Sequence, residues 1–241
     1  MKFTTAIISA VLAFTSFTEA APRNSRRTEY QPSSLTAQLR LADTTAERFS
    51  LLPNDSDFVF DFNDKKQDNP GKGGMLIAAN RKTFPALVGT GSGMAFGKVD
   101  PCGMNTLHVH PRSAELQIVT SGRLITEMVP ENGVLDKDGK RRVIRTDLTA
   151  NMMTPFYQGS VHTQFNPECQ PATFIATFAS EDFGTGQIAD ELVALSDDVI
   201  AATFGQSIAG EDIEKVRAAI PKSIALGVDE CLVKCGLKKN Y

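Results

Sequence analysis

The alternation of apolar and polar residues separates a helical stretch near the start of the 241-residue chain from a long β-rich region. From Ser34 to Leu51, apolar residues recur every three or four positions, which is the spacing of an amphipathic helix. After Pro53 the chain changes to short runs rich in Val, Ile, Phe and Thr, separated by turns that contain Gly, Pro, Asn or Asp. These runs predict strands at 57–62, 75–79, 84–89, 93–99, 106–111, 114–121, 123–129, 141–146, 149–154, 160–166 and 172–179. So many short strands at near-regular spacing indicate an all-β sandwich or barrel.

Helical spacing returns beyond Phe183. Ser196 and the two residues after it can cap a helix that runs through Phe204, and further helices are predicted at 210–219 and 222–235. The expected architecture is therefore an all-β core with flanking N- and C-terminal α-helices. Because terminal helices on a closed β unit commonly pack against a neighbouring subunit, we also expect a homo-oligomer.

Residues 1–20 have the features of a secretory signal peptide. Lys2 precedes an apolar run over 6–14, and Thr18 and Ala20 occupy the small-residue positions before a cleavage site. No later stretch reaches the roughly 18 apolar residues that a transmembrane helix needs, so no membrane span is expected. We therefore expect a protein secreted to the extracellular space, with the cell wall as one destination. Asn54 begins an Asn-Asp-Ser sequon and is the candidate glycosylation site.

Charge and cysteine content narrow the function classes. The formal net charge is −3 and no basic stripe is present, so nucleic acid is a poor candidate partner. The four cysteines would pair in an oxidising compartment, where three connectivities are open to them. Disulfides are favoured over a zinc site, because the Cys231 and Cys235 pair has no companion ligands nearby in the chain.

All three histidines of the chain fall in two β-like segments. His108 and His110 are two residues apart, so on a strand their side chains point to the same face. Glu115 follows at a spacing at which a strand, a turn and a second strand can bring its carboxylate back to the two histidines. His162 lies on a later β-like run. A lone His-x-His pair is usually structural, but imidazoles together with a carboxylate suit a divalent transition metal.

These segments resemble the two sequence motifs of the cupin superfamily in its germin form. In the first, His108, His110, Glu115 and Gly122 keep the family spacing, and in the second, residues 159–166 follow the pattern G-x2-H-x3-N. The departures at Gly103, Leu107 and Tyr157 leave the four ligand positions in place. The whole chain is most similar to the spherulin-like members of the germin group.

The resemblance implies a cupin jelly-roll β-barrel over 53–205, preceded by a leader and helix over 21–52 and followed by a helical tail over 206–241. It implies that His108, His110, Glu115 and His162 bind Mn(II), with Fe or Zn as alternatives, and that about two coordination positions stay open. Asn105 is then the candidate substrate contact. Gln164 and Asn166 either hold the ligands from behind or only bridge strands. The antiparallel motif strands of such a barrel also imply a Cys102–Cys169 disulfide, with Cys231–Cys235 as a second pair.

Two classes of function follow from the resemblance. The first is a secreted manganese oxidoreductase whose substrate is oxalate, a related small carboxylate or superoxide. Oxalate decarboxylation is the weaker enzymatic option, since enzymes of that kind usually carry two cupin units and this chain has one set of ligands. The second is a non-catalytic wall, spore or encystment protein with a metal-stabilised barrel. A zinc-binding, receptor-like cupin is a remote third. Because all three histidines are assigned to the metal, none is left as a separate acid–base catalyst.

Overall fold

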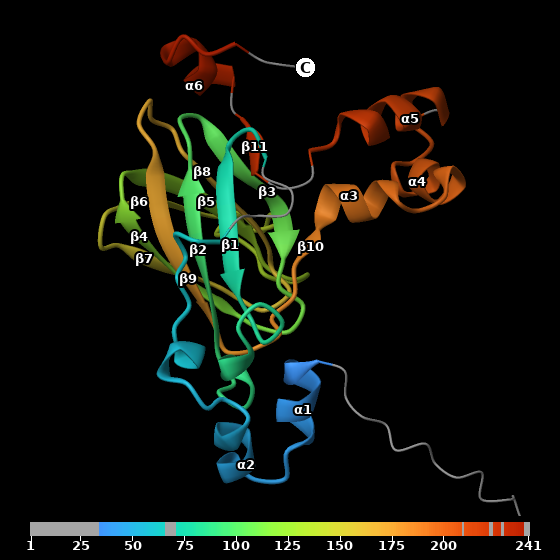
Figure 1. Ribbon diagram of the computed structural model, residues 1–241. Coiled ribbons are helices and arrows are strands. Elements are labelled where there is room, and N and C mark those ends of the chain that lie inside the picture. Colours follow the sequence, from blue (N-terminus) through green and yellow to red (C-terminus); the bar gives the residue numbers. More distant parts are fainter. Residues whose placement is uncertain (1–33, 66–70, 209, 222–223, 228, 239–241) are drawn as a thin grey trace, which may run out of the picture.

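A computed structural model describes residues 34–65, 71–208, 210–221, 224–227 and 229–238, so the predicted signal peptide lies outside the described residues. Two antiparallel sheets face each other and enclose the core (Figure 1). One sheet has the order β1-β2-β9-β4-β7; the other has the order β10-β3-β8-β5-β6, with β11 also pairing with β3. The strands are β1 (Gly74–Ala79), β2 (Gly93–Val99), β3 (Gly103–Val109), β4 (Glu115–Ser121), β5 (Arg123–Val129), β6 (Ile144–Thr149), β7 (Met153–Phe156), β8 (Val161–Phe165), β9 (Ala172–Phe178), β10 (Gly186–Gln187) and β11 (Ile224–Leu226).

The core lies between the sheets because the strands alternate buried and more exposed residues. In β9, buried positions occur at every second residue from Ala172 to Phe178. Phe174 is 1% exposed, and burying a ring of this kind contributes about 1.5–3 kcal/mol. Gly97 of β2 lies directly under that ring, where a Cβ would be 2.2 Å from the ring carbons. The predicted all-β barrel with terminal helices is confirmed.

The predicted helix over 34–51 is in fact two short helices, α1 (Leu35–Leu41) and α2 (Thr45–Ser50). A local signal breaks it, because Thr44 and Glu47 form a capping box. The Glu47 amide donates to Thr44 Oγ1, and the Thr44 amide donates to Glu47 Oε2, each at 3.2 Å. This box begins a second helix in the middle of an apolar pattern that continues across it.

The predicted strands at 57–62 and 84–89 are wrong, and short 3-10 helices at Asp55–Phe58 and Pro85–Leu87 overlap them instead. Asn54 begins the first of them and is exposed; its glycosylation stays a prediction. The predicted strands 141–146 and 149–154 lie a few residues further along, as β6 and β7. The turn between those strands includes Asn151, which has a positive φ of 69°.

The C-terminal part is more varied than predicted. The helices are α3 (Ile188–Val193), α4 (Asp197–Thr203), α5 (Gly210–Ala219) and α6 (Asp229–Lys234), and α3 was not expected. The predicted helix over 222–235 is instead β11 followed by α6. The cause is tertiary, because Ile224–Leu226 pairs with Asn105–Gly103 along the edge of β3. Figure 1 shows α3, α4 and α5 projecting to one side of the barrel and α6 at its far end from α1 and α2. No helix in the described part of the chain is long and apolar enough to be a membrane span.

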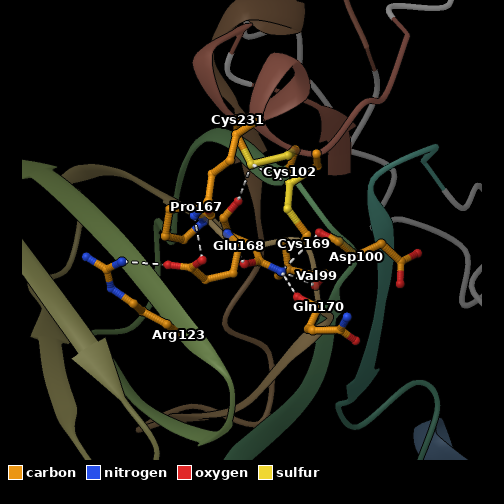
Figure 2. Close-up of a disulfide and its surroundings, with 12 residues drawn as sticks. Val99, Asp100, Cys102, Arg123, Pro167, Glu168, Cys169, Gln170 and Cys231 are labelled. Atoms are coloured by element: carbon orange, nitrogen blue, oxygen red, sulfur yellow. Dashed lines mark hydrogen bonds and ion pairs between the residues drawn. A yellow bond between two sulfur atoms is a disulfide. The ribbon is translucent and has the colours of Figure 1, made fainter.

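The predicted disulfide pairing is wrong, although the four cysteines do meet. Cys102 bonds to Cys231 and Cys169 bonds to Cys235, with Cα–Cα separations of 5.5 and 5.4 Å (Figure 2). Cys231 lies on α6 and Cys235 follows its last residue, about one turn further on, and their sulfur atoms are 3.9 Å apart. Each of these two cysteines therefore forms its disulfide with a cysteine in a different turn of the barrel, and the two do not bond to each other. The two bonds fasten α6 to the loops that follow β2 and β8.

Candidate metal centre

His108, His110, Glu115 and His162 converge inside one end of the barrel. His108 is near the end of β3, His110 follows that strand, Glu115 begins β4, and His162 lies in β8 opposite His108. All four side chains are buried, and one potential ligand atom from each lies within 4.8 Å of the others. The structure therefore brings together the four residues that the two sequence motifs single out.

A β-bulge gives β3 a second inward-facing polar residue near these ligands. In a regular strand, Asn105 and His108 would face opposite sides of the sheet, because they are three residues apart. The pairing of β3 with β8 shifts register between them, so that Asn105 pairs with Gln164 and His108 with His162. Both Asn105 and His108 are thereby buried, while Leu107 between them is 45% exposed.

Each imidazole is held by a hydrogen bond to a backbone carbonyl. Nδ1 of His108 lies 2.7 Å from the Thr106 oxygen, Nδ1 of His110 lies 2.6 Å from the Gly184 oxygen, and Nδ1 of His162 lies 2.8 Å from the Ser160 oxygen. A carbonyl oxygen can only accept, so each Nδ1 must donate its proton. The three Nε2 atoms are consequently left with their lone pairs free, as metal ligation by histidine requires.

The position of the Glu115 carboxylate calls for a cation. Its Oε2 lies 2.9 Å from His110 Nε2 and 3.3 Å from His162 Nε2. An ionised carboxylate has only lone pairs to present, so these contacts are repulsive unless a proton or a metal ion neutralises them. Two ligands at right angles around an ion with bonds of about 2.1 Å would be about 3 Å apart, close to the separations seen here. The residues present therefore fit a metal ion.

The charge states of the site match this geometry. Burial, reinforced by the nearby His162, lowers the pKa of His108 from 6.5 to about 3, so its imidazole is neutral at pH 7. Burial alone would raise the pKa of Glu115. The close approach of the His110 and His162 side chains outweighs burial and lowers the pKa of Glu115 to about 2. The cluster thus offers a neutral nitrogen and an anionic oxygen, which is the protonation state a metal needs.

Comparison with known proteins decides the family. A family model described as cupin matches residues 60–212, well over half of the chain. The chain belongs to the cupin family.

This cupin has relatives in both groups that its motifs resemble. Spherulin-1A of Physarum polycephalum is 34% identical over 203 residues, which cover 84% of this chain and 79% of the relative. A probable germin-like protein of Arabidopsis thaliana is 31% identical over 137 residues, covering 56% of this chain and 61% of the relative. A solved oxalate oxidase in complex with glycolate has the same fold, with a TM-score of 0.60 at 18% identity, covering 68% of this chain and 81% of that one.

A small cavity adjoins the ligands of this cupin. Its volume is about 50 Å³, and its walls include His108, His110, Glu115 and Asn105. The opposite wall is mostly apolar and includes Phe174, Phe178 and Phe183. Pockets for drug-sized ligands are roughly 300–1,000 Å³, so this one admits only a very small molecule.

The loop after β9 closes one side of that cavity and also supports a ligand. Phe183 lines the cavity, and the carbonyl of the next residue, Gly184, accepts the hydrogen bond from His110. Arg112 holds the loop in place. Its Nε donates to the Asp182 carbonyl at 2.7 Å, and its backbone amide donates to the Phe183 carbonyl at 3.2 Å.

The other predicted site residues divide into two groups. Asn105 lines the cavity and donates from Nδ2 to Gln164 Oε1 at 3.0 Å, so Gln164 lies directly behind it. Asn166 does not support the ligands, so the option that it holds them from behind is corrected. Its Nδ2 donates to the carbonyls of Val99, Asp100 and Gln170, and it thus ties together the turns that carry two of the cysteines.

Acid should destabilise the metal-free protein. Between pH 6.5 and 3, His108 takes up a proton in the unfolded chain but not in the folded one, so the free energy of unfolding falls as the pH drops. The expected slope is about 1.4 kcal/mol per pH unit. Glu115 adds to the slope below pH 4.5, because its carboxylate is then protonated in the unfolded chain while it stays ionised in the folded protein down to a pKa of about 2. Urea unfolding at pH 7 and pH 5 measures the effect. The variant His108→Gln should flatten the slope above pH 4.5, and equal stability of the wild type at both pH values would contradict the prediction.

Proposed function

We propose that this cupin is a secreted manganese-dependent oxidoreductase that acts on oxalate or a similarly small carboxylate. The observation that carries the proposal is the position of the four ligands beside a cavity of about 50 Å³. Four protein ligands leave about two of six octahedral positions free, so a substrate can reach the ion. The oxalate oxidase of the same fold was solved with glycolate, a carboxylate of the size this cavity admits.

The donor set is compatible with Mn(II). Three imidazoles and one carboxylate provide a mixed nitrogen and oxygen site without thiolates. Manganese, iron and zinc ions all accept ligands of this kind. When bound, a redox-active ion would supply one-electron chemistry that zinc cannot. Open coordination positions also favour superoxide as a second substrate, because superoxide needs no binding contact beyond the ion.

The protein's own residues would bind and shield the substrate. Asn105 presents an amide group to the cavity, and its hydrogen bond to Gln164 fixes the orientation of that amide. The side chains of Phe178 and Phe183, stacked with their ring centroids 3.8 Å apart, keep water from the apolar wall. No lysine or arginine is among the described residues that line the cavity, so a bound anion would be neutralised by the ion.

Secretion is supported by two observations of different kinds. Residues 1–20 have the composition of a signal peptide, and all four cysteines are paired in disulfides. Structural disulfides form and persist outside the reducing cytosol.

One preparation tests the function. Wild-type protein loaded with Mn(II) should show the six-line electron spin resonance signal. It should also oxidise oxalate to carbon dioxide with dioxygen as the oxidant, which is reduced to hydrogen peroxide. Asn105→Ala should keep the signal but lose most of the oxalate activity, mainly through a higher KM. Superoxide removal should change little in this variant, because it does not need the amide. Bound manganese with neither activity would refute the enzymatic proposal and favour the non-catalytic wall, spore or encystment role.

A further inference from the structure

Four buried polar atoms in the described part of the chain have no hydrogen-bond partner, and all belong to three neighbouring residues. They are Glu115 Oε1, both amide atoms of Gln117, and Gln164 Nε2. Gln117 and Gln164 are fully buried, with 0% exposure. Folded proteins rarely leave such atoms unpaired, because each has given up its hydrogen bonds to water. Their concentration in one place therefore needs an explanation.

The strand register places these residues in two adjacent layers of the barrel interior. Glu115 on β4 faces His162 on β8, with Oε2 and Nε2 3.3 Å apart. Two residues further along each strand, on the same face, come Gln117 and Gln164. Since both strands step away from the ligands in this direction, the two glutamines lie at the same level of the barrel interior, one layer beneath the metal centre.

The unpaired atoms are complementary in kind. Glu115 Oε1 and Gln117 Oε1 are acceptors without a donor, whereas Gln117 Nε2 and Gln164 Nε2 are donors without an acceptor. They can combine as two hydrogen bonds, from Gln164 to Gln117 and from Gln117 to Glu115. The bond from Asn105 Nδ2 to Gln164 Oε1 is already formed. One continuous chain then runs from Asn105 in the cavity to the carboxylate ligand.

We propose that Gln117 is a positioning residue that completes a hydrogen-bond relay from Asn105 through Gln164 and Gln117 to Glu115. The relay rests on the proposed metal centre. With an ion held by the Glu115 carboxylate, the oxygen Oε1, which has no partner, would accept from Gln117, directly or through one bridging water. Gln117 touches neither substrate nor ion, but it fixes the carboxylate that does. The relay also joins the residue assigned to the substrate with a metal ligand.

The variant Gln117→Met tests the relay, since methionine matches the length of glutamine without its amide. We expect a fall in Mn(II) affinity of about 10–100-fold, which is the usual cost of losing a group that supports a ligand. The electron spin resonance line shape of bound Mn(II) should change, and the rise in Tm on metal binding should shrink. The Tm of the metal-free protein should not fall, because an unpaired buried amide is removed.

The matched control is Thr154→Val. Thr154 is the register partner of Gln117 on β7 and is also buried, but it has no part in the relay. It should keep the wild-type affinity and spectrum. If Gln117→Met does not fold, Gln164→Met interrupts the same relay at its other link and should lower the affinity in the same way. A folded variant with wild-type affinity and spectrum overturns the relay alone, whereas wild-type protein that binds no metal overturns the proposed function and the relay with it.

Discussion

Replacing His162 by alanine is expected to abolish stable metal binding. The change removes one of four ligands and leaves Glu115 Oε2 paired with His110 alone. Because loss of a supporting group already costs about 10–100-fold in affinity, loss of a ligand should cost more than about 100-fold. A metal ion present at a hundredfold excess over its Kd stabilises the folded protein by about 2.7 kcal/mol. This stabilisation should be lost in the variant. Metal content after dialysis and urea unfolding with and without Mn(II) measure both effects.

Phe156→Leu is the matched control for this variant. The Phe156 ring stacks on His162 with a centroid separation of 4.2 Å and an interplanar angle of 14°. Its replacement disturbs the packing around the imidazole but removes no ligand, so metal should still bind. A His162→Ala protein that retains one metal ion per chain through dialysis would show that the four residues do not form the site.

Removing the Cys102–Cys231 disulfide with a pair of serine substitutions should destabilise the protein by about 4–5 kcal/mol, the chain-entropy value for a loop of its length. The paired residues are 129 apart in the chain, against 66 for Cys169 and Cys235. From loop-closure entropy, we therefore expect loss of the Cys169–Cys235 disulfide to destabilise the protein by about 0.6 kcal/mol less. Urea unfolding of the two double variants measures both losses.

Peptide mapping of the oxidised wild type checks the pairing behind this prediction. Peptides that join Cys102 to Cys231 and Cys169 to Cys235 are expected. Double variants as stable as the wild type would show that α6 is held mainly by packing. That packing is limited, because the buried cluster under the helix comprises little more than Leu232 and the cysteines themselves.

The barrel and the ligand set could be predicted because their signals are local. The strands at 93–99 and 123–129 have the predicted bounds, since alternation of apolar residues reports burial directly. The ligands share a short motif, and their strand geometry places His108 and His110 together. The role of Gln117 was also open to prediction. Glu115, Gln117 and Val119 alternate on one face of a strand, so a polar residue directly beneath a ligand was visible in the sequence.

What could not be predicted depends on contacts between distant segments. Residues 224–226 have no strand signal of their own and become β11 only because the edge of β3 is available. Gly73 permits this approach, as a Cβ there would lie 2.0 Å from the Ala225 oxygen. The disulfide pairing follows from the position of α6, which the helical pattern did not fix. The Gly184 carbonyl that holds His110 is a backbone group, and backbone groups leave no residue-type signature.

The pairing of β11 with β3 bears on the order in which the protein is assembled. β3 carries Asn105 and His108, and β11 covers the part of its edge that includes Asn105. Chains fold during synthesis from the N-terminal side, and β11 and α6 follow the rest of the barrel in the chain. β8 and β10, which also pair with β3, precede α5 in the chain, so only the segment Gly103–Asn105 depends on β11 for its edge partner. This part of the β3 edge, which includes Asn105 of the cavity wall, therefore gains its partner only after the rest of the barrel has been synthesised.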